Sequence, residues 1–264
     1  MNDKPIAVFD SGVGGLTVLK ELERLLPNED FIYLGDTART PYGTRSVERI
    51  QAFAVENIIF LMHYMPKMIV VACNTVSSTS LDFLQNIFAV PIIGVIKPGA
   101  IAACHTSSNR KIGVTGTQAT IKSGSYKREI EQIDNTAEVF SAACPLFVPL
   151  AEEGFLSNPI TDLTVEYYLH PLKNKGIDTL LLGCTHYPLL IESISRFMGD
   201  SIKVIDSAYQ TARDVEKYIT SNNYSNSQNK GTTRFFVTDS PEKFKNTGQQ
   251  FLYRNIENVV LKPV

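Results

Sequence analysis

Four cysteines, Cys73, Cys104, Cys144 and Cys184, are the residues of this chain with the most obvious capacity for proton-transfer or nucleophilic chemistry. None belongs to a CxxC pair or has zinc-ligand spacing to a histidine, so neither a metal site nor a disulfide framework is expected. Cys73 in VVACNT and Cys184 in LLGCTH each end an apolar run and precede polar residues that can begin a helix. Ligands of parallel α/β proteins bind at the carboxyl ends of strands, where a helix N-terminus favours the thiolate. Cys73 and Cys184 are therefore the candidate reactive thiols.

The other two cysteines lack this setting. Cys104 stands near an expected helix end, and Cys144 lies between an apolar stretch and Pro145, so both are expected to be buried or incidental. A pair of thiols suits racemisation, because the pKa of cysteine, about 8.5, makes both thiol and thiolate accessible near neutral pH. One thiolate could remove a proton from a carbon atom while the opposite thiol returns one. Preorganised N–H groups around a substrate carboxylate would stabilise the carbanion.

Apolar, β-branched runs alternate with stretches of helical period along the chain, which predicts an α/β fold with mostly parallel sheets. The first series predicts strands at 5–10, 31–36, 68–73 and 90–95 and helices at 14–26 and 46–64. The second series predicts strands at 111–116, 138–144, 179–184 and 203–206 and helices at 118–133, 158–175 and 187–198. The remainder predicts a helix at 206–220, a polar linker at 221–231, a strand at 234–239 and a helix at 240–252.

The two series correspond at nearly constant offsets. The offset is about 106 residues between the starts of IAVFDSG and IGVTGT. It is about 108 residues between Pro41 and Pro149 and about 111 between Cys73 and Cys184. Three matches in one order predict two pseudo-symmetric three-layer α/β domains, although chance similarity between α/β segments is the alternative. We expect residues 1–95 plus 207–264 to form the first domain and residues 96–206 to form the second.

The glycine-rich run DSGVGGLT at 10–17 follows the first predicted strand and begins a helix. It departs from the dinucleotide fingerprint GxGxxG because Thr17 occupies the third glycine position. Asp36, at the end of the second strand, could still bind a ribose, so a nicotinamide-dependent enzyme stays an alternative. The other interpretation is that the glycines let backbone N–H groups approach a small anion, with Asp10 and Ser11 in the same cleft.

Charge and hydropathy exclude two other classes of partner. The net charge is −2 and the lysines and arginines are scattered, so a nucleic-acid partner is not expected. The longest apolar stretch is interrupted by His63, Pro66 and Lys67, so no membrane span is expected. The N-terminus lacks a basic region followed by an apolar one, which predicts a cytoplasmic protein without a signal peptide.

Six motifs together resemble those of the glutamate racemases of the aspartate/glutamate racemase family. They are DSGVGGL at 10–16, GDTARTPYG at 35–43, ACNT at 72–75, TGTQAT at 115–120, CPLFVPLAEEG at 144–154 and GCTHYP at 183–188. The resemblance implies an active site in the cleft between two pseudo-symmetric domains. It also implies interconversion of L- and D-glutamate without a cofactor or metal, for bacterial peptidoglycan synthesis, by a homodimer.

The same motifs imply roles for individual residues. Cys73 and Cys184 would be the two catalytic bases, assisted by Asp10, Glu152 and His186; because Glu153 adjoins Glu152, that assignment depends on the motif. The substrate-binding residues would be Asp10, Ser11, Tyr42, Gly43, Asn74, Thr75, Thr117, Thr120, Thr185 and His186. An aspartate or hydantoin racemase fits the same two thiols, and a small-ligand binding protein would explain the cleft without them.

Overall fold

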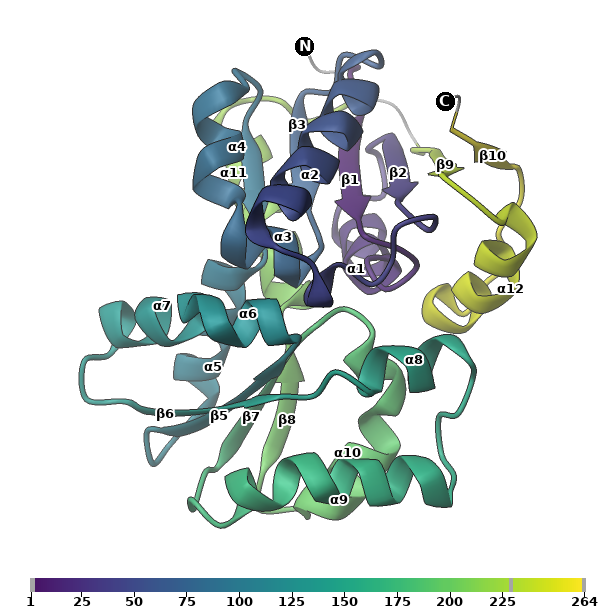
Figure 1. The fold of residues 1–264 in the computed structure, drawn as a ribbon. Helices are drawn as coiled ribbons and strands as arrows, with labels where there is room; N and C mark the ends of the chain where they lie inside the picture. The colour runs from purple at the N-terminus through teal and green to yellow at the C-terminus, as the bar shows by residue number, and fades with distance from the viewer. Residues whose placement is uncertain (1–2, 228–229, 263–264) are drawn as a thin grey trace.

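Two parallel β-sheets form the framework of the protein in its computed structural model, which describes residues 3–227 and 230–262 (Figure 1). The first sheet contains, in spatial order, β10 (Val259–Leu261), β9 (Thr233–Val237), β2 (Phe31–Gly35), β1 (Ile6–Asp10), β3 (Met68–Val71) and β4 (Ile92–Gly94). The second contains β6 (Glu138–Ala143), β5 (Lys111–Gly116), β7 (Thr179–Gly183) and β8 (Lys203–Asp206). Each sheet with the helices on its faces is called a lobe, the first and the second.

The two sheets repeat one topology, which confirms the predicted α/β fold with two similar halves. The order β2-β1-β3-β4 in the first sheet is matched by β6-β5-β7-β8 in the second, and every pairing is parallel. Strands β9 and β10 extend the first sheet beyond β2. The sequence predicted β9 but not β10. The domain boundaries after residues 95 and 206 stay a prediction.

Each lobe has three layers, because alternate side chains of its strands point to opposite faces. In β1, Ile6 and Val8 belong to one hydrophobic cluster, and Ala7 and Phe9 belong to the cluster on the other face. One face of the first sheet carries α1 (Leu16–Leu25), α11 (Ala208–Ser221) and α12 (Pro241–Leu252), and the other carries α2 (Val47–Met62), α3 (Asn74–Thr79) and α4 (Leu81–Ile87). In the second lobe α8 (Phe147–Glu152), α9 (Pro159–Lys173) and α10 (Ile191–Met198) face α5 (Ile96–Thr106), α6 (Gln118–Ser123) and α7 (Ser125–Ile133) across the sheet.

Two helices connect the lobes. Helix α5 leads from β4 of the first sheet to β5 of the second, and α11 leads from β8 back to β9. The two helices pack against each other, while α5 also contacts α7 and α11 contacts α1. The route by which the chain leaves the first lobe therefore lies beside the route by which it returns.

Two helices were predicted longer than they are. The predicted helix at 118–133 is divided into α6 and α7 by Gly124, whose φ of 67° lies in the left-handed region that glycine adopts without strain. The predicted helix at 187–198 begins as a 3₁₀ turn, η2 (Tyr187–Leu190), before α10.

The predicted polar linker at 221–231 includes residues 228 and 229, which lie outside the described residues. In the part of the chain that is described, no helix has the length and apolar character needed to cross a membrane.

Candidate active site

A small pocket between the lobes collects side chains from the carboxyl ends of both sheets. Its wall from the first lobe consists of Ser11, Thr40, Pro41, Tyr42, Gly43, Cys73, Asn74 and Thr75. Its wall from the second lobe consists of Thr117, Val148, Cys184, Thr185 and His186. Both candidate thiols therefore line one small polar pocket. Sequence reasoning gave no role to Thr40 or Val148, since neither side chain has a chemical signature that distinguishes it from packing residues.

Cys73 lies between β3 and α3 and is nearly fully buried, with 4% of its surface exposed. Its Sγ atom is 3.5 Å from the hydroxyl oxygen of Ser11. Burial and, to a smaller extent, the negative charge of Asp10 raise the pKa of the Cys73 thiol to about 12. The expectation of a favoured thiolate is therefore wrong for Cys73 in this state. Desolvation outweighs the backbone N–H of Val76 at the start of a helix of only six residues.

Cys184 directly follows β7 and has different partners. His186 Nε2 is 3.1 Å from Glu152 Oε1, and His186 is almost entirely buried. Burial alone would lower the pKa of His186, but hydrogen bonding to Cys184 and Glu152 and their charges outweigh it and raise this pKa to about 10. Burial likewise opposes ionisation of Glu152, yet the hydrogen bond with His186 leaves the pKa of Glu152 lowered. A protonated imidazole thus stands beside Cys184 near neutral pH.

Asp10 lies behind the pocket and joins the lobes. Its carboxylate is fully buried at the end of β1. One oxygen accepts the N–H of Gly12 at 2.9 Å, and the other accepts the hydroxyl of Thr185, from the second lobe, at 3.2 Å. Burial raises the pKa of Asp10, and the positive charge of His186 acts in the opposite direction. Asp10 is thereby coupled electrostatically to both thiol sites.

Two glycines permit the close approach of the lobes. A Cβ atom on Gly14 would lie 2.5 Å from the hydroxyl oxygen of Thr185 and 2.7 Å from Nδ1 of His186. A Cβ atom on Gly43 would lie 2.4 Å from Cβ of Thr117. The glycine-rich run therefore packs against the second lobe, and the space above Gly14 is filled by side chains rather than open to a dinucleotide.

A cluster of threonine hydroxyls borders the pocket where α3 and α6 meet. Thr75 Oγ1 is 2.9 Å from Thr117 Oγ1, which lies 3.0 Å from Thr120 Oγ1. Thr117 also caps α6 by accepting the N–H of Thr120 at 3.2 Å. Thr117 belongs to the pocket wall and Thr120 does not. Thr120 instead fixes the hydroxyl of Thr117 from behind.

Glu152 also lies outside the pocket wall, and it approaches the site through His186. Its Oε1 atom accepts a hydrogen bond from the hydroxyl of Thr40 at 3.4 Å, which joins α8 to the turn before η1 (Tyr42–Thr44). Its neighbour Glu153 instead forms an exposed ion pair with Lys243 of α12 at 3.2 Å. The structure thus distinguishes the two adjacent carboxylates, which the sequence alone could not.

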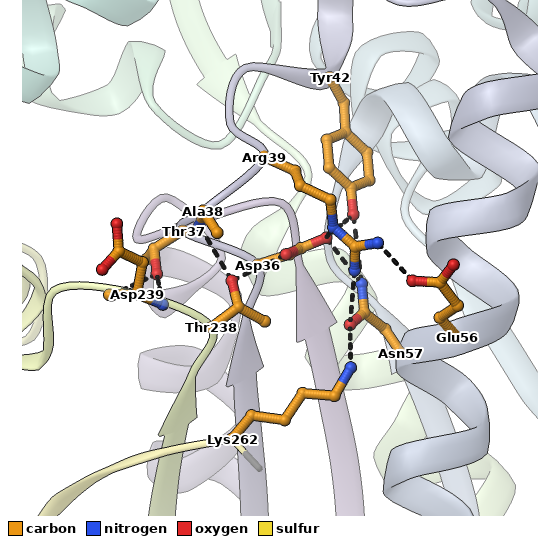
Figure 2. A network of polar contacts seen from close by, with 10 residues as sticks. All are labelled: Asp36, Thr37, Ala38, Arg39, Tyr42, Glu56, Asn57, Thr238, Asp239 and Lys262. Atoms are coloured by element: carbon orange, nitrogen blue, oxygen red, sulfur yellow. Dashed lines mark hydrogen bonds and ion pairs between the residues drawn. The ribbon is translucent and has the colours of Figure 1, made fainter. Parts of the chain in front are cut away.

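A polar network anchors the turn that carries Tyr42 and Gly43 (Figure 2). The fully buried carboxylate of Asp36 accepts hydrogen bonds from the hydroxyl of Tyr42, from Asn57 Nδ2 at 2.9 Å and from the hydroxyl of Thr238 at 2.8 Å. Arg39 Nε donates to the same carboxylate at 2.7 Å. The Tyr42 hydroxyl therefore points toward Asp36, a residue outside the pocket wall. Asp36 acts as a structural anchor between β2, α2 and the end of β9.

The described residues include no group of three or more histidine, cysteine, aspartate or glutamate side chains placed to hold a metal ion. All four cysteines are free thiols: Cys144 is buried, and Cys104 is partly exposed on α5. Cys144 lies in the core of the second lobe, and burial raises its pKa. The positions of Cys104 and Cys144 are those expected of residues that pack rather than react.

Two thiols at equivalent strand ends of a duplicated α/β fold, facing one pocket, form the arrangement that a two-base racemase requires. Residues 6–215 match the family described as Asp/Glu/Hydantoin racemase. The chain belongs to this family.

Individual relatives are similar over nearly their full length. A glutamate racemase of Geobacter metallireducens is 47% identical over 94% of this chain and 93% of its own. The crystal structure of a glutamate racemase from Bacillus anthracis superposes with a TM-score of 0.96 at 39% identity, covering 100% of this chain and 99% of that one. The glutamate racemase of Francisella tularensis, solved in complex with D-glutamate, gives a TM-score of 0.93 at 40% identity, covering 100% and 98%.

Proposed function

We propose that this protein is an isomerase that interconverts L- and D-glutamate, using Cys73 and Cys184 as its two bases and no organic cofactor or metal. The observation that carries the proposal is the position of both thiols in one polar pocket between the lobes. The similarity to glutamate racemases over nearly the whole chain supports glutamate as the substrate. The D-glutamate produced would supply peptidoglycan synthesis.

The reaction needs one proton transfer on each face of the substrate. The thiolate on one face removes the proton from the α-carbon, and the electron pair of the broken C–H bond stays on the substrate as a carbanion. The thiol on the other face then donates its proton to the same carbon. The configuration of the α-carbon is inverted, and the two sulfurs have exchanged their protonation states. The reverse reaction therefore uses the same groups.

The surroundings of the thiols supply the remaining requirements. His186, held protonated by Cys184 and Glu152, would stabilise negative charge at Cys184, and Asp10 would assist at Cys73. Negative charge on the substrate carboxylate increases as the carbanion forms. Preorganised N–H and hydroxyl donors next to that carboxylate lower the barrier because they need no reorganisation. Thr75 and Thr117 lie in the pocket wall and can provide such donors.

The substrate-binding set that we propose has two parts. Pocket-wall residues would contact glutamate directly: Ser11, Tyr42, Gly43, Asn74, Thr75, Thr117, Thr185 and His186. Asp10 and Thr120 would contribute from the layer behind, since Asp10 holds Thr185 and Thr120 holds Thr117. Tyr42 would contribute its backbone, because its hydroxyl bonds to Asp36.

The decisive experiment incubates the purified protein with L-glutamate in deuterium oxide without added cofactor. We expect optical rotation to decay to zero while deuterium enters the α-position. Retention of both the rotation and the α-proton would contradict the proposal. Parallel incubations with L-aspartate and a chiral hydantoin test the alternative substrates, and faster loss of rotation with either would replace glutamate. An increase in glutamate turnover on addition of NAD⁺ would instead favour the nicotinamide alternative.

We also propose that the protein acts in the cytoplasm as a homodimer, as the family resemblance implies. Light scattering coupled to size-exclusion chromatography should then give twice the mass of one chain. A monomer mass at the concentrations used for assay would contradict this part of the proposal without affecting the chemistry.

A further inference from the structure

Tyr126, in α7, is a buried residue outside the pocket wall that contacts a residue within it. Its hydroxyl donates a hydrogen bond to Oδ1 of Asn74 at 2.5 Å. Asn74 is the first residue of α3 and lines the pocket next to Cys73. A side-chain amide has one acceptor oxygen and one NH₂ donor group. Because the oxygen is engaged by Tyr126, the amide is left with its NH₂ group for a ligand.

The direction of this hydrogen bond is fixed by the state of the phenol. Only 3% of the surface of Tyr126 is exposed, and burial raises the pKa of its hydroxyl well above the usual range, so the phenol keeps its proton. Ser207 lies next to Tyr126 and lowers the pKa of its hydroxyl. An amide oxygen only accepts hydrogen bonds, so the phenol proton is directed to Asn74 Oδ1. An NH₂ group facing the pocket suits a carboxylate ligand, whereas a carbonyl oxygen there would repel one.

The ring of Tyr126 is also held in place by the connections between the lobes. A Cβ atom on Gly183 would lie 2.8 Å from the ring, and one on Gly99 would lie 3.0 Å from it. Gly99 belongs to α5, and Ser207 precedes α11, the two helices that connect the lobes. The same Cβ atom on Gly99 would lie 3.1 Å from Cβ of Ser207. Tyr126 is thus packed between both connections and the strand that leads to Cys184.

We propose that Tyr126 is a positioning residue that orients the Asn74 amide so that its NH₂ group binds the α-carboxylate of the substrate. The proposal rests on the glutamate racemase activity proposed above. Tyr126 does not touch the substrate and acts through Asn74. Through Gly99 and Ser207, the orientation of this amide also depends on the relative position of the two connecting helices.

The test compares Tyr126→Phe with wild type in steady-state racemisation of both enantiomers. Losing one hydroxyl that positions a binding group should raise KM about tenfold for L- and D-glutamate alike. We expect a smaller fall in kcat, about threefold, because charge on this carboxylate increases as the carbanion forms and a less well oriented amide stabilises it less. Tyr187→Phe is the matched control. Tyr187 is also buried in the second lobe, but its hydroxyl donates to the backbone carbonyl of Cys144 at 2.8 Å. The Tyr187→Phe variant should lose thermal stability and keep the wild-type KM.

A double-mutant cycle separates positioning from general loosening. In an Asn74→Ala background, Tyr126→Phe should have no further effect on KM, because the amide through which it acts is gone. Ser207→Ala gives an independent test should Tyr126→Phe not fold: it should raise KM about two- to threefold.

An unchanged KM in Tyr126→Phe, or the same increase in Tyr187→Phe, would overturn the inference, as would effects that simply add in the cycle. With Tyr126→Phe unfolded, an unchanged KM in Ser207→Ala would do so. Failure of the proposed function is recognised separately, since wild type itself would then not racemise glutamate.

Discussion

The two thiol sites occupy equivalent positions of the repeated fold yet have opposite electrostatic surroundings. Cys73 has the carboxylate of Asp10 nearby, and its pKa is raised to about 12 by burial and by that charge. Cys184 instead has His186, whose pKa is raised to about 10, against burial, by its interactions with Cys184 and Glu152. The folded state thus places an anion near one sulfur and a cation near the other. A duplicated scaffold need not give a duplicated environment.

This asymmetry has a functional meaning for a reaction that must run in both directions. One thiol and one thiolate are needed at the start of every turnover, and identical surroundings would favour neither assignment. The anion near Cys73 favours the neutral thiol there. The cation near Cys184 compensates negative charge at that sulfur. Racemisation in the opposite direction then starts from the less favoured protonation state, and Asp10 and His186 offer proton-exchanging partners for reaching it.

The largest effect should come from removing either thiol, since each is required on its own face of the substrate. Cys73→Ala and Cys184→Ala should each lower the rate of racemisation by about 10²–10⁴-fold or more. Polarimetry with both enantiomers measures this. Cys104→Ala and Cys144→Ala are the controls and should retain wild-type rates once folding is verified. Equal losses in all four variants would mean that the thiols matter for stability rather than for chemistry.

The next largest effect should come from disturbing the contact between the glycine-rich run and the Cys184 side. An alanine at Gly14 would place its Cβ against Thr185 and His186 at distances that real Cβ contacts do not show. We expect Gly14→Ala to lower kcat about 10²-fold through displacement of His186. Gly12→Ala is matched in chemistry but meets its nearest atom, Thr40 Oγ1, at an ordinary 3.4 Å. A Gly12→Ala variant as impaired as Gly14→Ala would argue against this explanation.

The pH dependence of the free energy of unfolding should identify His186 as the cation beside Cys184. The pKa of His186 is raised from 6.5 to about 10 in the folded state, so its contribution to stability is complete below about pH 6.5 and is lost as the pH rises toward 10. The raised pKa of Cys73 acts in the same direction, but only at a pH above the ordinary pKa of a cysteine. Denaturant unfolding between pH 6.5 and 9 should therefore show declining stability in wild type and a flatter profile in His186→Asn. The exposed His170 is the control, and a wild-type slope that survives His186→Asn but not His170→Asn would contradict this assignment.

The smallest effect should come from the anchor behind the first-lobe wall of the pocket. Asp36→Asn replaces an acceptor of several buried hydrogen bonds and should lower the free energy of unfolding by about 1–3 kcal/mol. We expect only a few-fold rise in KM, through movement of the Tyr42–Gly43 turn. Asp162→Asn removes an exposed ion pair with Arg196 and should change stability by less than about 1 kcal/mol. Similar urea midpoints for the two variants would show that the network does not anchor the turn.

The sequence by itself determined the repeated α/β framework and most of the pocket wall. Alternating apolar runs and helical periods are local signals, and the nearly constant offset between the two series placed Cys73 and Cys184 at equivalent strand ends. The carboxyl ends of parallel strands meet at one edge of a sheet, so most of the predicted residues do line the pocket. The motif resemblance supplied glutamate as the expected substrate, which two cysteines alone do not specify.

Tertiary structure decided the environment of each group. The raised pKa of Cys73 follows from burial and from Asp10, which is more than sixty residues away in the chain, so a local rule for helix N-termini gave the wrong direction. The choice of Glu152 over Glu153, and the contact of Tyr126 with Asn74, likewise depend on which side chains meet across the folded chain. Desolvation and charge interactions are summed over spatial neighbours, and a pattern along the sequence does not contain that sum.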